Sequence, residues 1–383
     1  MKEKFFTIQV NERGKKSLDY KHPWIYQKSC IINNTKINAG DIVFISYKND
    51  IQAAGFFDGD SLFAVKILEF NVNPENFNID TIIKTKILKA AEYRKKIGAG
   101  DVCRLVHGEA DGIPGLFVER YGEQIVIQYA FNGIYGLKEN ITNCIKELFP
   151  DCPVYEINPA REKKIVSGKP EFPIKIEMDG IKFYFNPDGQ KTGFYLDQRV
   201  NRINLSKYAK ENARVLDAFA YTGAFALYCM KNGASADIIE YNKKYSEQFA
   251  QNCALNGWRE SRYRIYNGRS EEILKTLDCK YDMIFLDPPA LVSKKHQIKN
   301  ALQYIHNIFI EAAGLLKPGG IISVSVCSNS LTGDSLNRTL MNACAAIGKQ
   351  FRIIYENRAG LDHPAILNFP DGDYLKCIGL QML

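Results

Sequence analysis

Four short motifs in the second half of the chain carry side chains that could do chemistry. They are DAFAYTGAFAL at 217–227, the acid Glu240, DPPA at 287–290 and VCSNS at 326–330. Each follows an apolar run typical of a buried strand, so each stands where a strand is expected to end. Together they supply carboxylates, a thiol and a tight turn. These groups can hold a polar ligand and attack an electrophilic carbon.

The first motif predicts a cofactor other than a dinucleotide. Its turn contains one glycine, Gly223, where a dinucleotide-binding turn needs GxGxxG, so NAD is disfavoured. Backbone N–H groups of Thr222 and Gly223 can meet a carboxylate, Asp217 lies near an ammonium, and Glu240 can accept from ribose hydroxyls. An amino acid joined to a ribose describes S-adenosylmethionine. The alternative is that Asp217 only caps a helix and Glu240 is a solvated strand end.

The third and fourth motifs indicate chemistry on a base. Two prolines fix the backbone after Asp287, whose carboxylate could accept a hydrogen bond from an exocyclic amine. Amino-group methyltransferases usually carry an aromatic residue at the position of Ala290, so amine methylation is less favoured. Cys327 should face the same crevice, and a thiolate that adds to carbon 6 of a pyrimidine makes carbon 5 nucleophilic. The alternatives are a capped turn at Asp287 and an inert core cysteine.

The elements that must position these motifs alternate between strand and helix after about residue 195. Apolar runs such as RVLDAF, DIIE, YRIY, YDMIFLD and IISVSV are separated by segments with helical patterns. This rhythm predicts a parallel sheet covered on both faces, with ligands at the carboxyl ends of the strands.

The first half of the chain predicts two smaller arrangements. Residues up to about 70 alternate short apolar runs with turns, which indicates a β-rich domain. An Asn-rich linker at 71–80 leads to a helix near 80–97. From 113 we expect a hairpin, a helix near 136–148 and a second hairpin that turns at Asp179 and Gly180, forming one compact unit.

Composition limits the class of protein. Of the 383 residues 46% are hydrophobic and 24% charged, which is typical of globular domains, and the net charge of +7 is compatible with a polyanionic partner. The 10 cysteines form no CxxC pair and no metal-like spacing, so we expect reduced thiols and no metal. No apolar run is long enough for a bilayer, and the N-terminal residues lack a secretion-like segment, so we expect a cytoplasmic protein without membrane contact.

The chain resembles, over nearly its whole length, the large-subunit (23S) ribosomal RNA cytosine-5 methyltransferases. The segments that carry the resemblance are GKKSLDYKHPWIY, HGEADGIPGLFVERYG, PDGQKTGFYLDQRVNR, DAFAYTGAFAL, DPPA, VCS and DHPAILNFPDGDYLK. The resemblance implies an α/β fold class. A PUA-like domain over 1–72 would be followed by a small central α+β domain over 73–186. A class I (Rossmann-like) methyltransferase with a mostly parallel seven-stranded sheet would cover 187–383.

The resemblance also implies roles for particular residues. Cys327 would be the catalytic nucleophile, and Asp287 would contact the target cytosine and border the cofactor. The residues implied to bind S-adenosylmethionine are Phe194, Asp197, Arg199, Asp217, Phe219, Tyr221, Thr222, Gly223, Glu240 and Asp287.

Three positions depart from the family pattern. A tyrosine-lysine pair expected early in the helix after DPPA is reduced to Tyr304 and Ile305. Ala290 stands where the family usually has a lysine. The acid expected to receive the adenine amine is replaced within NGR at 267–269, so we expect Asn267 or a backbone group to take that role.

Ribosomal RNA is the partner that the resemblance implies. Basic residues near the start of the PUA-like segment are expected to contact its phosphates, namely Arg13, Lys15, Lys16, Lys21 and Lys28. A solvated basic face is the alternative. Three questions stay open at this point: transfer to another base atom such as a guanine nitrogen, a non-catalytic RNA-binding protein with the same fold, and a homodimer.

Overall fold

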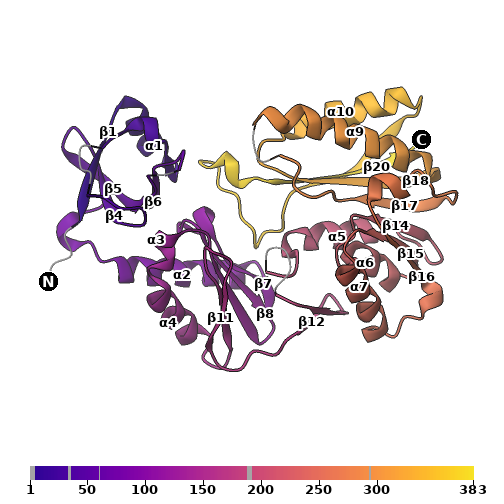
Figure 1. Ribbon diagram of the computed structural model, residues 1–383, viewed down its shortest axis with the longest axis horizontal. Helices are drawn as coiled ribbons and strands as arrows, with labels where there is room; N and C mark the ends of the chain where they lie inside the picture. The colour runs from indigo at the N-terminus through magenta and orange to yellow at the C-terminus, as the bar shows by residue number, and fades with distance from the viewer. Residues whose placement is uncertain (1–4, 33–35, 60, 188–191, 293–294) are drawn as a thin grey trace. The chain divides into compact units, whose positions relative to one another are not determined.

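The computed structural model describes residues 5–32, 36–59, 61–187, 192–292 and 295–383, and it separates into two compact units. Unit 1 contains Met1–Glu171 and Leu361–Gly372, and unit 2 contains Phe172–Gly360 and Asp373–Leu383 (Figure 1). The expected division into three domains stays a prediction.

Unit 1 begins with a six-stranded sheet in the order β2-β6-β5-β4-β1-β3. Helix α1 (Glu12–Asp19) starts at Asn11, whose side chain accepts hydrogen bonds from the N–H groups of Arg13 and Gly14. Fully buried Ile25, Val43 and Ile45 belong to the core of this sheet. The strands are β1 (Phe6–Val10), β2 (Trp24–Ile25), β3 (Cys30–Ile31), β4 (Ile42–Tyr47), β5 (Asp50–Phe57) and β6 (Val65–Phe70).

A five-stranded sheet in the order β11-β10-β9-β8-β7 forms the rest of unit 1. The long helix α2 packs against α4 and β7, around buried Ile83, Ile87 and Ile145. The strands are β7 (Val102–His107), β8 (Leu116–Tyr121), β9 (Gln124–Tyr129), β10 (Val154–Ile157) and β11 (Lys163–Ser167), and the helices are α2 (Ile79–Lys96), α3 (Asn132–Tyr135) and α4 (Lys138–Leu148).

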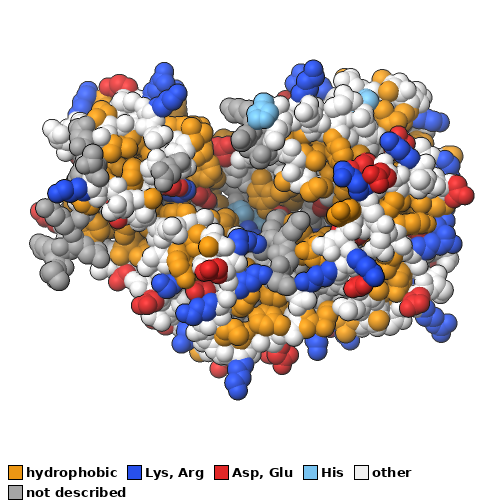
Figure 2. Space-filling view, in the orientation of Figure 1, with side chains coloured by type: hydrophobic (Ala, Val, Ile, Leu, Met, Phe, Trp, Pro, Cys, Tyr) orange, Lys and Arg blue, Asp and Glu red, His pale blue; other side chains and the backbone are white. Residues whose placement is uncertain are grey.

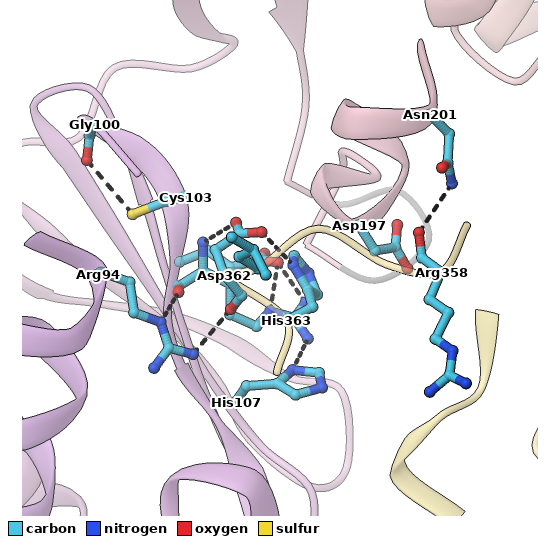
Figure 3. A network of polar contacts seen from close by, with 12 residues as sticks. Arg94, Gly100, Cys103, His107, Asp197, Asn201, Arg358, Asp362 and His363 are labelled. Atoms are coloured by element: carbon cyan, nitrogen blue, oxygen red, sulfur yellow. Dashed lines mark hydrogen bonds and ion pairs between the residues drawn. The ribbon is translucent and has the colours of Figure 1, made fainter. Parts of the chain in front are cut away.

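Residues 361–372, far along the chain, belong to unit 1 through a buried polar network (Figure 3). Arg94 Nη2 donates to the Asp362 carbonyl at 2.9 Å, and the Arg104 backbone N–H donates to the Asp362 carboxylate at 3.0 Å. The ring of His363 packs against that of His107 at 5.2 Å between centroids. His363 is therefore a buried partner of Asp362 within unit 1.

Unit 2 is built on a seven-stranded sheet in the order β16-β15-β14-β17-β18-β20-β19. All neighbours from β16 to β18 pair in parallel, and β20 is antiparallel to both β18 and β19. The strands are β14 (Arg214–Ala218), β15 (Ser235–Glu240), β16 (Tyr263–Asn267), β17 (Tyr281–Leu286), β18 (Leu316–Cys327), β19 (Phe351–Asn357) and β20 (Leu375–Met382). The predicted mostly parallel α/β sheet is confirmed.

Helices cover both faces of this sheet (Figure 1). Helices α5 (Arg199–Ser206), α6 (Ala224–Lys231) and α7 (Lys243–Leu255) lie on one face, and α9 (Ile298–Gly314) and α10 (Gly333–Ala346) lie on the other. The short helix α8 (Ser270–Ile273) follows β16. Buried Leu216, Ile284, Val324 and Phe309 fill the space under α9, which explains why these strands read as unbroken apolar runs.

The second predicted hairpin forms, and it belongs to unit 2. Strands β12 (Ile174–Met178) and β13 (Ile181–Phe185) pair only with each other among the described strands, and they belong to unit 2. Strand β13 packs on α7, where the Asn252 side chain accepts from the N–H of Tyr184 at 2.7 Å. The hairpin packs on helices of the large sheet and groups with unit 2, whereas the 113–148 segment groups with unit 1.

Candidate active site

The turn between β14 and α6 is held in a strained conformation. Phe219, Tyr221 and Gly223 have φ angles of 64°, 53° and 70°. A left-handed backbone costs a non-glycine residue roughly 1–2 kcal/mol. At Gly223 a Cβ atom would lie 2.2 Å from Phe249 Cδ2, so this position also needs the absence of a side chain. Such strain is typical of turns that approach a ligand closely.

Glu240 ties this turn to the next strand. One carboxylate oxygen accepts from the Tyr221 N–H at 2.8 Å, and the other accepts from the Asn242 N–H at 2.8 Å. Burial is the main cause of a raised pKa at Glu240, opposed by these backbone hydrogen bonds. Each carboxylate oxygen has a second lone pair, so Glu240 can still accept from a ligand hydroxyl.

Asp217 is 1% exposed at the end of β14. Its carboxylate accepts from the Ala226 N–H at 3.1 Å in the first turn of α6, so it does cap that helix. Burial raises the pKa of Asp217 to about 8, with the Ala226 hydrogen bond and the Arg202 charge acting in the opposite direction. A positive charge bound beside this buried carboxyl would lower its pKa and favour the ionised form.

Asp287 follows β17 and is held from the side of α5. Gln198 Nε2 donates to the Asp287 carboxylate at 3.1 Å, and the side-chain Oε1 of Gln198 accepts from Asn201 Nδ2 at 2.6 Å. Asn201 is fully buried and also accepts from the Tyr355 hydroxyl at 2.7 Å. This buried chain fixes the orientation of the Asp287 carboxylate.

Cys327 is the last residue of β18 and is half-buried. Lys376, on the antiparallel neighbour β20, interacts electrostatically with Cys327 and donates to the carbonyl of Ser328 at 3.0 Å. Burial lowers the pKa of Lys376. An ammonium at this place favours the thiolate form of a neighbouring cysteine.

One cavity of about 690 Å³ joins these groups, which is within the usual range for small-molecule sites. The sequence-predicted residues that line it are Asp197, Asp217, Phe219, Tyr221, Thr222, Glu240, Asp287 and Cys327. The structure therefore brings the predicted nucleophile and the predicted cofactor acids to one cavity at the carboxyl ends of the parallel strands.

Four predicted cofactor residues are not among the described residues that line this cavity. Gly223 shapes the turn, and its N–H donates to the Ala220 carbonyl at 2.8 Å. Asn267 accepts from the Ser246 hydroxyl at 2.5 Å. Phe194 is buried against Phe183 of the β12–β13 hairpin, and Arg199 is ion-paired with Asp179 at 2.8 Å.

Sequence reasoning missed several residues of the cavity wall. Glu271 is one, two positions after the NGR segment in the first turn of α8. Burial pushes the pKa of Glu271 up, but hydrogen bonds and the Arg269 charge bring it below its ordinary value. Other missed lining residues include Tyr195, Gln198, Arg202 and Tyr304. An acid shortly after a strand end was a usable signal for Glu271, and Arg202 is the last residue of the segment PDGQKTGFYLDQRVNR that carries the resemblance.

The predicted RNA-contacting residues lie on the first sheet of unit 1. Arg13, Lys15 and Lys16 are on α1, Lys21 precedes β2, and Lys28 is in the short 3-10 helix Gln27–Ser29 that follows β2. All are exposed except Lys15, which is partly covered and ion-paired with Asp19. On the visible face of the molecule, Lys and Arg side chains are spread among acidic and apolar ones (Figure 2).

The described residues hold no group of three or more His, Cys, Asp or Glu side chains that could bind a metal ion. In the same part of the chain no helix is long and apolar enough to cross a membrane.

The sheet order and the cavity at its carboxyl edge define a class I methyltransferase fold. Residues 154–362 match the S-adenosylmethionine-dependent methyltransferase family, and residues 8–70 match a PUA-like domain. The chain belongs to the S-adenosylmethionine-dependent methyltransferase family, and its methyl donor is S-adenosylmethionine.

Similar proteins agree with this assignment. The chain is 29% identical over 389 residues to Ribosomal RNA large subunit methyltransferase I of Escherichia coli (strain UTI89 / UPEC), with 96% of this chain and 97% of that protein covered. The protein of the same name from Klebsiella pneumoniae (strain 342) is 28% identical over 404 residues and is covered fully, as is this chain. A methyltransferase solved in complex with SAH superposes with a TM-score of 0.86 at 15% identity, covering 98% of this chain and 100% of that one.

Proposed function

We propose that this protein transfers a methyl group to carbon 5 of a cytosine in large-subunit (23S) ribosomal RNA, through a covalent adduct with Cys327. One observation carries the proposal: Cys327 and Asp287 line the same cavity as the acids Asp217 and Glu240. A methyltransferase that acts on a nitrogen needs no thiol beside its donor, whereas carbon 5 requires a nucleophile at carbon 6.

The relatives named as ribosomal RNA large subunit methyltransferases, together with the PUA-like match, support ribosomal RNA as the substrate. Such a substrate favours action in the cytoplasm. The exposed residues Arg13, Lys16, Lys21 and Lys28 would contact RNA phosphates, with Lys15 beside them, and would make binding dependent on salt.

The cofactor fits the cavity through the chemistry of its wall. Asp217 would take the ammonium, Glu240 the ribose hydroxyls, and Glu271 with Ser270 the adenine edge, in place of Asn267. Phe219, Tyr221 and Thr222 would form the wall on the side of the strained turn. S-adenosylmethionine, when bound, supplies an electrophilic methyl group beside Cys327 and Asp287.

In the proposed mechanism, the target cytosine is flipped out of its stack and enters the cavity, at a cost of about a few kcal/mol. Cys327 Sγ forms a bond to carbon 6, and the electron pair of the 5,6 double bond moves to carbon 5. Asp287, oriented by Gln198, accepts a hydrogen bond from the exocyclic amine. After carbon 5 has gained the methyl group it loses its proton to a base or water. The bond from sulfur to carbon 6 then breaks, and the thiolate is released.

The test uses large-subunit ribosomal RNA that carries tritium on carbon 5 of its cytosines. The expected result is tritium release to water by the wild type with S-adenosylmethionine and no release by Cys327→Ala. Cys344→Ala is the matched control, because Cys344 lies on α10 and is not among the described cavity residues. Equal release by wild type and Cys327→Ala would refute the role of the thiol.

A further inference from the structure

Arg202 on α5 is an unusual residue in the wall of the cavity. Its side chain is almost fully buried, with 4% of the residue exposed, and it lines the same cavity as Asp217. Among the described residues, its Nε and Nη1 atoms have no hydrogen-bond partner. The guanidinium lies over the rings of Phe194 at 5.1 Å and Phe225 at 5.6 Å. The two aromatic rings therefore fix the plane of the Arg202 guanidinium, which still has N–H donors without an acceptor.

A buried cation with unsatisfied donors is costly, and proteins rarely keep one without use. Burial lowers the pKa of Arg202, although Tyr228, Asp197, Asp287 and Asp217 act in the opposite direction. These groups act on the guanidinium only at longer range, and among the described residues none accepts a hydrogen bond from Nε or Nη1. The site therefore has room for an acceptor that arrives with a ligand.

The ligand group that suits this guanidinium is a carboxylate. Arginine donors are planar and preorganised, and they match carboxylate oxygens better than a lysine does. Arg202 and Asp217 interact electrostatically, and both line the cavity. An α-amino acid carries its carboxylate and its ammonium on one carbon. Its binding site therefore needs a positive group for the carboxylate and a negative group for the ammonium close together.

We propose that Arg202 binds the α-carboxylate of S-adenosylmethionine while Asp217 takes the ammonium. This inference rests on the cofactor and not on the target base proposed above. It also revises the expectation that backbone N–H groups of the turn hold the carboxylate, because the Gly223 N–H already donates to the Ala220 carbonyl. Phe194 and Phe225 act as positioning residues that keep the guanidinium plane in place.

Isothermal titration calorimetry can separate a carboxylate contact from a structural role. The probes are S-adenosylhomocysteine and its decarboxylated analogue, which keeps the amine, the ribose and the adenine. For the wild type we expect at least tenfold tighter binding of the compound with the carboxylate. In Arg202→Met that preference should fall to within about twofold, while the affinity for the decarboxylated analogue changes little.

Lys207→Met is the control for loss of a cation beside α5, because Lys207 is exposed at the end of that helix. It should keep the wild-type preference, and Arg202→Lys should keep part of it. Equal weakening of both probes in Arg202→Met would show a purely structural role and overturn the proposal. If Arg202→Met does not fold, the wild-type protein still tests the proposal. Equal affinities of the wild type for the two probes would overturn it.

RNA is absent from these titrations, so failure of the cytosine-5 proposal leaves them unaffected. An RNA phosphate is the competing partner for Arg202. If Arg202→Met keeps its preference for S-adenosylhomocysteine but loses affinity for ribosomal RNA, the cofactor assignment is wrong and the phosphate is the partner.

Discussion

Binding of S-adenosylhomocysteine should release a proton from Asp217. Burial raises the pKa of this carboxyl to about 8 in the protein without ligand, so most molecules hold the proton at pH 7. The ligand ammonium requires the ionised form, because a neutral carboxyl gives it no countercharge. Binding at neutral pH is therefore expected to expel about one proton.

The size of the effect follows from that pKa. With a value of about 8, roughly 1% of Asp217 is ionised at pH 6 and about half at pH 8. If the bound form stays ionised over this range, the affinity for S-adenosylhomocysteine should rise about fiftyfold from pH 6 to pH 8. The charged groups that act on Asp217 are Arg202, Asp287 and Glu240, and Glu240 also has a raised pKa.

Calorimetry in two buffers with different ionisation enthalpies counts the released protons. The control ligand is 5′-methylthioadenosine, which keeps the ribose that Glu240 would bind but lacks the amino acid. Proton release with S-adenosylhomocysteine and none with the control would assign the linkage to the amino-acid end. Asp217→Asn should abolish it. An affinity that does not change between pH 6 and pH 8 would refute the reasoning.

The raised pKa of Asp217 also makes the free energy of unfolding depend on pH. The folded-state pKa of Asp217 lies above its unfolded value, so its contribution to the free energy of unfolding falls as pH rises from about 4 to about 8. Asp217→Asn should flatten that part of the pH–stability profile.

Two further predictions concern the turn and the thiol. Gly223→Ala should lower the free energy of unfolding by about 2–5 kcal/mol, since it adds left-handed strain and a contact with buried Phe249, and it should weaken cofactor binding. Gly257→Ala, at φ 73° with open space around the added carbon, should lose only about 1–2 kcal/mol in the same denaturant titration, and an equal loss in both variants would contradict this account. Lys376→Met should slow alkylation of Cys327 by iodoacetamide severalfold at pH 7 and move the pH profile of alkylation upward. An unchanged profile would show that Lys376 does not favour the thiolate.

The fold of unit 2 was predictable because its strands are buried on both faces. Ile284 and Val324 belong to apolar runs that are typical of a covered parallel sheet, and those runs lead to Asp287 and Cys327. The meeting of these residues in one cavity follows from the parallel pairing of β17 with β18. Strand-end chemistry is therefore visible in the sequence.

The parts that sequence reasoning missed depend on packing between distant segments. The β12–β13 hairpin looked like part of the preceding unit, because nothing near Ile174 shows that Asn252 of α7 will bind its edge. The unmet donors of Arg202 depend on where Phe194 and Phe225 place its guanidinium. Glu271 lies in the short helix α8 after β16, and its place in the cavity wall depends on how α8 packs beside the strand ends.

The most direct test of the central claim identifies the methylated nucleoside itself. Large-subunit ribosomal RNA that lacks this modification is incubated with the wild-type protein and S-adenosylmethionine carrying a labelled methyl group, then digested to nucleosides and separated by mass spectrometry. The account predicts label in 5-methylcytidine, and none with Cys327→Ala. Label in a methylated guanosine, or in 5-methylcytidine made equally well by Cys327→Ala, would contradict it.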